Sequence, residues 1–145
     1  MPKFTIELDP SNDQLHHIEA HSARLLEIHN TLSEQCDKNG KVDFRAMLYS
    51  INQMRYRNRA LYEISAKSIR SIARNLNRYR TEGYGHAYPI EVTTRGFRPY
   101  HQSVKLGRYG VIKTKNPMPV INNYIKHAVL RKTSDTQWVL DLDVA

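Results

Sequence analysis

A lone strand at the start of the chain constrains the fold more than any other feature of the sequence. In residues 3–8, Phe4, Ile6 and Leu8 alternate with polar residues, which predicts a short β-strand. The residues after it carry helical patterns, and strand-like segments return only near residue 90. Because an unpaired strand leaves its backbone groups unsatisfied, we expect it to pair with those later strands. The helices are then an insertion into a small antiparallel β-barrel or sheet, and the expected fold class is α+β.

Three helices are expected between residues 11 and 81. The first begins after the cap region 9–13 and ends at 38–40, with one face formed by Leu15, Ile18, Ser22, Leu25, His29, Leu32 and Cys36. The second, capped by Asp43, has an apolar stripe formed by Phe44, Met47, Leu48, Ile51 and Met54, and residues 55–59 are either its last turn or a loop. The third, capped by Ser65, has an apolar face formed by Ile69, Ile72, Ala73, Leu76 and Tyr79.

Glycine and proline punctuate the chain after Thr81, and helical periodicity disappears. Strands are expected at residues 90–94, 103–106 and 110–113, the last two on either side of a turn at residues 107–109. The clearest element is a hairpin of residues 124–132 and 138–144, with a buried face formed by Trp138, Leu140, Leu142 and Val144 and the opposite face formed by Val139, Asp141 and Asp143. We therefore predict two domains, a β-domain of residues 1–10 and 82–145 and an inserted helical subdomain of residues 11–81.

Basic residues are concentrated in the middle of the chain. Residues 1–40 hold three basic and seven acidic residues, residues 41–80 hold ten basic and two acidic, and residues 81–145 hold nine basic and five acidic. The excess of the middle block equals the net charge of the whole chain, +8. A block of that density is typical of a protein that binds a polyanion. The alternative is a solvated helix face, but arginine predominates here, and its planar fork suits phosphate and stacks on bases.

The third expected helix has a cationic face opposite its apolar face. Lys67, Arg70, Arg74 and Arg78 follow one another at intervals of three and four residues, so they line up along one side. Like charges at this spacing repel one another, and a bound phosphate backbone would offset that repulsion.

Tyrosines alternate with arginines in several segments, which suits bases that stack on rings while guanidinium groups hold phosphates. Tyr56 lies between two arginines, Tyr79 lies between two more, Tyr109 follows Arg108, and residues 97–101 form a basic aromatic loop. Tyr79 is equally compatible with a core position. The predicted nucleic-acid-binding residues are Arg55, Tyr56, Arg57, Arg59, Lys67, Arg70, Arg74, Arg78, Arg95, Arg98, Tyr100, Lys105 and Arg108.

The sequence does not support an enzyme, a cofactor or a metal site. His17 and His21 are four residues apart, but the glutamate of the two-histidine zinc pattern is missing after the first of them. Asp141 and Asp143 share a strand face without a third oxygen ligand, and the single cysteine, Cys36, falls on an apolar stripe. No phosphate-cradling glycine loop or serine nucleophile elbow is found. With one cysteine, no apolar run long enough for a membrane span and no signal peptide, we expect a soluble cytoplasmic protein.

The order of these segments resembles that of TnpB proteins, the transposon-encoded RNA-guided nucleases related to type V CRISPR effectors. The segments that carry the resemblance are residues 4–14 (FTIELDPSNDQ), 61–66 (LYEISA) leading into Ile69, Leu76 and Arg78, 104–113 (VKLGRYGVIK) and 137–144 (QWVLDLDV). The resemblance covers most of the chain through weak motifs in the right order. It implies a barrel-like wedge domain with an inserted helical recognition domain, which together hold guide RNA and the guide–target duplex.

The chain departs from that family where its nuclease would begin. In the family, the tryptophan-containing strand is followed by a RuvC nuclease domain with an Asp, a distant Glu and a further Asp, whereas the residues here end at Ala145. A zinc ribbon is also missing, since only Cys36 is present. The resemblance therefore implies a nuclease-free binding lobe from a prokaryotic, phage or mobile-element context.

These observations favour a non-catalytic protein that binds structured RNA or an RNA–DNA duplex. An alternative is an accessory subunit or a phage-type inhibitor that docks on an RNA-guided nuclease complex, with the acidic first helix contacting protein while the basic half contacts nucleic acid. A third possibility is one half of a split nuclease whose catalytic residues belong to a separate chain.

Overall fold

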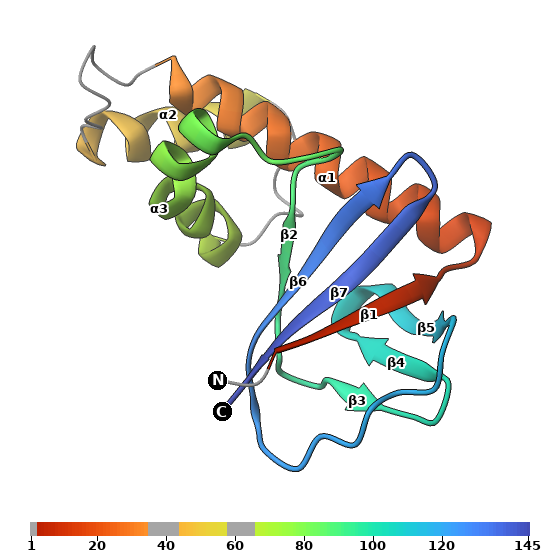
Figure 1. Ribbon diagram of the computed structural model, residues 1–145. Coiled ribbons are helices and arrows are strands. Elements are labelled where there is room, and N and C mark those ends of the chain that lie inside the picture. Colours follow the sequence, from red (N-terminus) through yellow and green to blue (C-terminus); the bar gives the residue numbers. More distant parts are fainter. Residues whose placement is uncertain (1–2, 35–43, 58–65) are drawn as a thin grey trace. The chain divides into compact units, whose positions relative to one another are not determined.

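The computed structural model describes residues 3–34, 44–57 and 66–145 (Figure 1). The fold is α+β, with an open antiparallel sheet and, among these residues, three long helices and one short 3-10 helix. The elements are β1 (Lys3–Asp9), α1 (Asn12–Ser33), α2 (Phe44–Arg57), α3 (Ala66–Glu82), β2 (Ile90–Val92), β3 (Arg98–Pro99), β4 (Ser103–Leu106), η2 (Gly107–Tyr109), β5 (Gly110–Thr114), β6 (Ile125–Ser134) and β7 (Gln137–Val144).

The first strand lies inside the sheet, as its isolation in the sequence predicts. The seven strands have the order β2-β6-β7-β1-β5-β4-β3, and every neighbouring pair is antiparallel. Residues Lys3 to Glu7 of β1 pair with β7, whereas Leu8 and Asp9 pair with β5, so β1 joins the two halves of the sheet. Of the two arrangements expected, barrel or sheet, the described strands form an open sheet, and its edges are the short strands β2 and β3.

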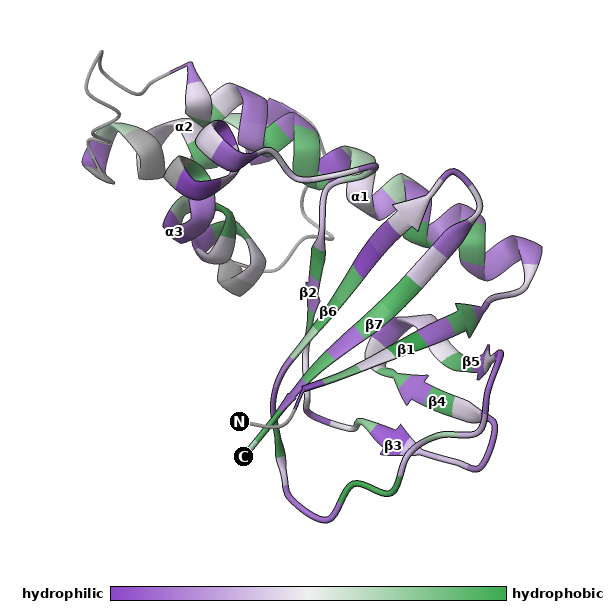
Figure 2. Ribbon diagram, viewed as in Figure 1, coloured by the Kyte–Doolittle hydropathy of each residue, from purple (hydrophilic) through white to green (hydrophobic). Residues whose placement is uncertain are grey.

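The β6–β7 hairpin supplies much of the core of the sheet. Trp138, Leu140, Leu142 and Val144 are buried as predicted, and hydrophobic and hydrophilic residues alternate along much of β7 (Figure 2). Val139, which the alternation places on the opposite face with Asp141 and Asp143, is buried as well, because its side chain is only 3% exposed. The strand pattern indicates which side a residue faces, but it does not indicate whether that side is covered.

The start of α1 is held by a reciprocal cap. The Gln14 backbone N–H donates to Ser11 Oγ (3.2 Å), and the Ser11 backbone N–H donates to Gln14 Oε1 (3.0 Å). The Gln14 amide also donates to the carbonyl oxygens of Val111 (2.7 Å) and Tyr109 (3.3 Å). These bonds attach the first turn of α1 to the β4–β5 turn. The helix ends at Ser33, earlier than predicted.

The described residues divide into two compact units. The β-unit comprises Met1–Ser22 and Gly85–Ala145, and the helical unit comprises Ala23–Tyr84, so the division falls within α1. The domains expected from the sequence, 1–10 with 82–145 and 11–81, stay a prediction.

The core of the helical unit is formed by one face of each helix. Its buried apolar residues are Leu25, Ile28, Leu32, Ile51, Ile69, Ile72 and Leu76. Most residues of the faces predicted for α1 and α3 are buried, while Leu15, Ala73 and Tyr79 are half-buried. On the predicted α2 stripe, Ile51 is buried and Met54 is half-buried. The side chains of the other stripe residues, Phe44, Met47 and Leu48, are not described. The caps predicted at Asp43 and Ser65, and Cys36, also lie outside the described residues. Among the described helices, none is both long and apolar enough to cross a membrane.

Candidate nucleic-acid interface

The cationic face of α3 is exposed. Arg70, Arg74 and Arg78 are exposed at intervals of four residues, while Ile72 and Leu76 are buried on the other side of the helix. We call these three arginines the α3 ridge. Lys67, the fourth predicted member, lies in the first turn of α3, but its side chain is outside the described residues. Residues on one helix face at this spacing rise about 6 Å per step, so the three guanidinium groups form a row of positive charge.

Arg78 differs from the other two members because it has partners within its own helix. Its Nε donates to Glu82 Oε2 at 3.4 Å, and its guanidinium lies 5.8 Å from the centre of the Tyr79 ring. The two charged side chains are about two-thirds exposed, so solvent screens the ion pair and its contribution to stability is small. A phosphate at this end of the ridge would compete with the Glu82 carboxylate for Arg78.

The arginine-rich end of α2 has both buried and exposed members. Residues 55–57 form the last turn of the helix, which was one of the two predicted alternatives. Arg57 and Tyr56 are exposed, whereas Arg55 is half-buried and packs beside Ile28, Ile51, Met54 and Ile69. Arg55 therefore differs from its prediction as a surface contact, since much of its stem covers the core of the helical unit. Arg59 lies outside the described residues.

A second exposed aromatic residue on α2, Tyr49, is missing from the sequence prediction. The side chains of Tyr49 and Tyr56 are 67% and 80% exposed. Seven residues make nearly two helical turns, so the two rings share one face about 10 Å apart. The seven-residue spacing is visible in the sequence, but Tyr49 has no arginine next to it, so the alternation of arginine with tyrosine does not indicate it. Arg45, one turn before Tyr49, and Arg57, next to Tyr56, are exposed, so positive charge lies beside this stacking surface.

In the β-unit, the edge of the sheet brings two predicted cations together. Arg98 of β3 and Lys105 of β4 are partners in antiparallel register, and both are exposed. Residues directly opposite in such a pair point to the same face, and like charges there repel. Arg98 was predicted to lie in a loop, but it belongs to the two-residue strand β3.

The remaining predicted residues of the β-unit lie in turns beside this edge. Arg95 is exposed in the turn before β3, and Tyr100, after β3, is 47% exposed. Arg108 is exposed in η2. The next residue, Tyr109, cannot serve as a stacking ring as its place beside Arg108 suggested, because its side chain is only 6% exposed.

Tyr109 contacts both His17 and His21, the two histidines whose spacing was considered for a zinc site. The Tyr109 hydroxyl is hydrogen-bonded to Nδ1 of His21, and its ring lies 5.2 Å from that of His17, centre to centre. Burial raises the pKa of the Tyr109 phenol, which is protonated at neutral pH even at its ordinary pKa of about 10. His21 is itself buried, which makes this cluster part of the contact between α1 and η2. Among the described residues, no group of three His, Cys, Asp or Glu side chains could hold a metal ion.

Asp141, on the β6–β7 hairpin, is engaged in internal contacts. Asp141 accepts hydrogen bonds from Thr5 Oγ1 (2.9 Å) and from Nε (2.6 Å) and Nη2 (3.2 Å) of Arg131. Burial would raise the pKa of Asp141, but these bonds and the charge of Arg131 outweigh it and lower the pKa. Both oxygens of Asp141, which was considered as a cation ligand, are therefore used within the hairpin.

Glu19 of α1 is held in a similar way. Its carboxylate accepts hydrogen bonds from Nζ of Lys132 (2.8 Å) and from Nε1 of Trp138 (3.0 Å). Burial would raise the pKa of Glu19, but these two donors outweigh it and lower the pKa. Lys132 and Trp138 are partners in the β6–β7 register, so one glutamate fastens α1 to both strands of the hairpin.

The exposed members of the predicted interface, together with Tyr49, thus fall into two sets, one in each unit. The helical unit carries the α3 ridge, Arg57 and the two α2 tyrosines, and the β-unit carries Arg95, the Arg98–Lys105 pair, Tyr100 and Arg108. Rows of guanidinium groups with nearby aromatic rings can hold phosphates and stack bases. No protein-family model and no curated protein matches this sequence.

Proposed function

We propose that this protein is a non-catalytic nucleic-acid-binding protein that holds structured RNA or an RNA–DNA duplex. The observation that carries the proposal is the α3 ridge. Its three arginines are exposed on the face opposite a buried apolar stripe, and solubility alone does not require such a row of like charges. The Arg98–Lys105 pair supports the same ligand chemistry in the β-unit.

The choice of RNA rests on the aromatic residues that accompany the cations. Exposed tyrosines on α2 and Tyr100 next to β3 offer rings to unpaired bases, while the arginines offer charge to phosphates. Duplex DNA presents no unstacked bases, so a purely duplex-binding surface has less use for such rings. An A-form RNA–DNA duplex with single-stranded ends would use both features.

The order of elements also suits a lobe related to TnpB proteins. We propose that the sheet corresponds to the wedge-like domain and that α1 to α3 correspond to the inserted recognition domain. The support consists of the motifs quoted above and the α+β fold, in which β1 pairs with strands that follow the helices.

Docking on an RNA-guided nuclease complex, as an accessory subunit or inhibitor, is the alternative function. The acidic balance of residues 1–40 favours it. On α1, however, Glu19 is already paired with Lys132, which leaves Asp13 and Glu27 as its exposed acids. Glu7, Asp9 and Glu34, outside this helix, are exposed as well, so the acidic surface of the described part of residues 1–40 is reduced only at Glu19.

The decisive experiment changes the three ridge arginines together. In the triple variant Arg70→Gln, Arg74→Gln and Arg78→Gln, folding should be nearly unaffected, because Gln retains most of the helix propensity of Arg. Titration of a labelled hairpin RNA with single-stranded ends should give a log–log salt slope of about −4 to −7 for the native chain. The triple variant should bind about 10- to 100-fold more weakly, with a slope about three units shallower.

The matched control is Arg80→Gln, which removes one exposed arginine from the same helix outside the ridge. It should change affinity less than Arg74→Gln does. Native RNA affinity and melting temperature in the triple variant would overturn the ridge mechanism and favour protein docking. We also expect the RNA to remain uncut in the presence of Mg²⁺ or Mn²⁺.

A further inference from the structure

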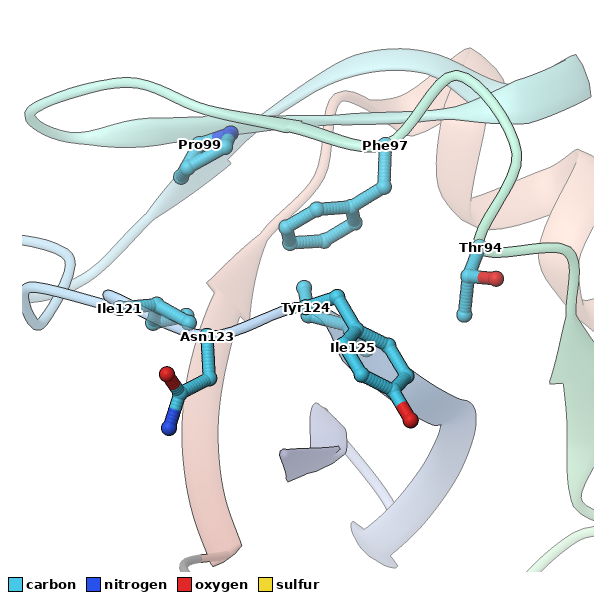
Figure 3. A pocket seen from close by; sticks show the side chains of 7 residues that line it. All are labelled: Thr94, Phe97, Pro99, Ile121, Asn123, Tyr124 and Ile125. Atoms are coloured by element: carbon cyan, nitrogen blue, oxygen red, sulfur yellow. The ribbon is translucent and has the colours of Figure 1, made fainter. Parts of the chain in front are cut away.

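The β-unit contains an open pocket of about 400 Å³ beside the basic edge of the sheet (Figure 3). One wall comes from the segment around β3, namely Thr94, Phe97 and Pro99, and the other from the segment that leads into β6, namely Ile121, Asn123, Tyr124 and Ile125. Its volume falls within the range of small-molecule sites in proteins. Sequence reasoning did not find it, because its two walls are far apart along the chain.

The first wall is shaped by a tight turn. The Phe97 backbone N–H donates to the carbonyl oxygen of Thr94 (3.2 Å), and Gly96, the third residue of the turn, has a φ of +79°. A positive φ at that place is characteristic of a type II turn and favours glycine. The turn directs the Phe97 ring toward the other wall (Figure 3) and leaves Arg95 exposed at its tip.

The second wall is attached to the end of the sheet. The Ala145 backbone N–H donates to the carbonyl oxygen of Tyr124 (3.1 Å), and the Asn123 side-chain amide donates to the carbonyl oxygen of Ala145 (2.8 Å). These bonds hold residues 123 and 124 next to the end of β7, so the wall exists before any ligand arrives. A preformed site loses less conformational entropy on binding.

The lining suits a flat aromatic ligand. Tyr124 is 71% exposed, so its ring has a face that a ligand can cover, and Phe97 is half-buried across from it. Pro99, Ile121 and Ile125 supply apolar surface around the two rings. Every nucleobase has a face that stacks on such rings, and RNA-binding proteins commonly accept bases that are turned out of the strand.

The charge around the pocket suits an anionic polymer. Arg95 and Arg98 alternate with pocket residues along the chain, and Lys105 lies opposite Arg98. Because successive strand residues point to opposite faces, Arg98 leaves the edge strand on the side away from Pro99. A chain that places one base in the pocket and passes around this edge would bring its phosphates to these cations.

We propose that this pocket binds one unstacked nucleobase from a single-stranded stretch of nucleic acid, with Arg95 and Arg98 on the adjoining phosphates. The proposal rests on the proposed function. It specifies the place on the β-unit where nucleic acid binds, and it specifies that the bound part is an unstacked base. A hydrophobic peptide is the competing occupant, but the arginines beside the pocket match phosphates, and the ring faces match bases.

The test uses the full chain and two labelled RNAs of equal length, a single strand and a blunt duplex. In Tyr124→Leu the wall stays apolar but the ring is lost, whereas Tyr124→Phe retains the ring. We expect Tyr124→Leu to weaken single-strand binding about 5- to 100-fold, with an unchanged salt slope and unchanged duplex affinity. Tyr124→Phe should bind like the native chain.

The matched control is Val120→Ala, which removes an exposed apolar side chain from the same segment but outside the pocket. The fluorescence of a single-stranded RNA that contains 2-aminopurine should be quenched when the native chain binds it. The quenching by Tyr124→Leu should be weaker. If both RNAs bind with steep salt slopes but Tyr124→Leu equals the native chain, the pocket proposal fails and the proposed function stands. If neither RNA binds, both proposals fail. Equal losses for single strand and duplex would indicate a structural role for Tyr124 and would also overturn the proposal.

Discussion

Arg98 and Lys105 lie directly opposite each other on β3 and β4, the last two strands at one edge of the sheet. The pairing places two cations on one face of a strand pair, where like charges destabilise the sheet. Edge strands commonly carry charges that discourage pairing with another chain. One cation, either Arg98 or Lys105, would be enough for that purpose. Under the proposed function, a phosphate contacted by both side chains would offset this repulsion.

Replacing Lys105 with glutamine tests this relationship. Because the change removes repulsion, we expect the free energy of unfolding at low salt to rise by about 0.2–1 kcal/mol. RNA affinity should fall about two- to fivefold, with a salt slope about one unit shallower. Denaturant unfolding and RNA titration of the same preparation would measure both effects.

A matched control is Lys113→Gln on β5. Lys113 is exposed but lies opposite Asp9 and Ser103 in register, so its loss removes an attraction and should not stabilise the sheet. Equal changes in unfolding free energy for the two variants would contradict the assigned repulsion.

The ion pair at the end of α3 predicts a variant that binds more tightly. Glu82→Gln removes the carboxylate that competes with phosphate for Arg78, so affinity for RNA should rise about two- to fivefold. Stability should change by less than about 0.5 kcal/mol, since the pair is exposed and screened. Titrations at low and moderate salt would show the gain shrinking as salt increases.

Glu27→Gln provides the comparison, because Glu27 is an exposed acid of the same unit on α1. A similar gain from that variant would mean that net charge, rather than the ridge, determines affinity.

Tyr49 and Tyr56 predict stacking on α2 that is independent of charge. Tyr49→Ala should weaken binding of a single-stranded RNA about 5- to 100-fold, while Tyr49→Phe retains the ring and the affinity. Neither variant changes a charge, so both should keep the native salt slope. Fluorescence anisotropy across a salt series would separate the two contributions. A native affinity in Tyr49→Ala would remove this residue from the interface.

The Arg131–Asp141 pair predicts a specific pH dependence of stability. Burial alone would raise the pKa of Asp141, but the hydrogen bonds from Arg131 and Thr5 and the charge of Arg131 lower it in the folded protein. A lowered folded pKa means that the stabilisation is present above the ordinary aspartate pKa of about 4 and is lost as pH falls through the folded value. Asp141→Asn should therefore be destabilised by about 0.5–1 kcal/mol at pH 7, after allowance for partial exposure, and by less near pH 3.

Urea unfolding at both pH values would measure this difference. Asp135→Asn, at the fully exposed turn of the hairpin, should show little effect at either pH. An Asp141→Asn penalty that is the same at pH 3 and pH 7 would contradict the assigned pair.

Sequence periodicity predicted the buried faces of several elements. The alternation in β1 and β7 and the helical spacing in α1 and α3 predicted their buried faces, because side-chain direction follows directly from backbone geometry. The need of β1 for a partner likewise implied pairing with strands that follow the helices, and β5 and β7 are those partners. The exposure of the α3 ridge also followed from helical spacing, because its arginines lie opposite the apolar face.

Contacts between distant segments were decided only by the tertiary structure. In the sequence, Arg108 and Tyr109 look alike as interface residues. In the structure, packing against α1 buries the Tyr109 ring, whereas Arg108 is exposed. Gln14 is recognisable as a cap residue, but its bonds to Val111 and Tyr109 depend on where the β4–β5 turn lies. Burial and long-range hydrogen bonds depend on which segments pack together. The residue pattern of one segment does not indicate which other segments pack against it. Alternation and helical spacing therefore predict the faces of single elements, whereas the burial of Val139, the half-burial of Arg55 and the pocket at Tyr124 depend on how the elements assemble.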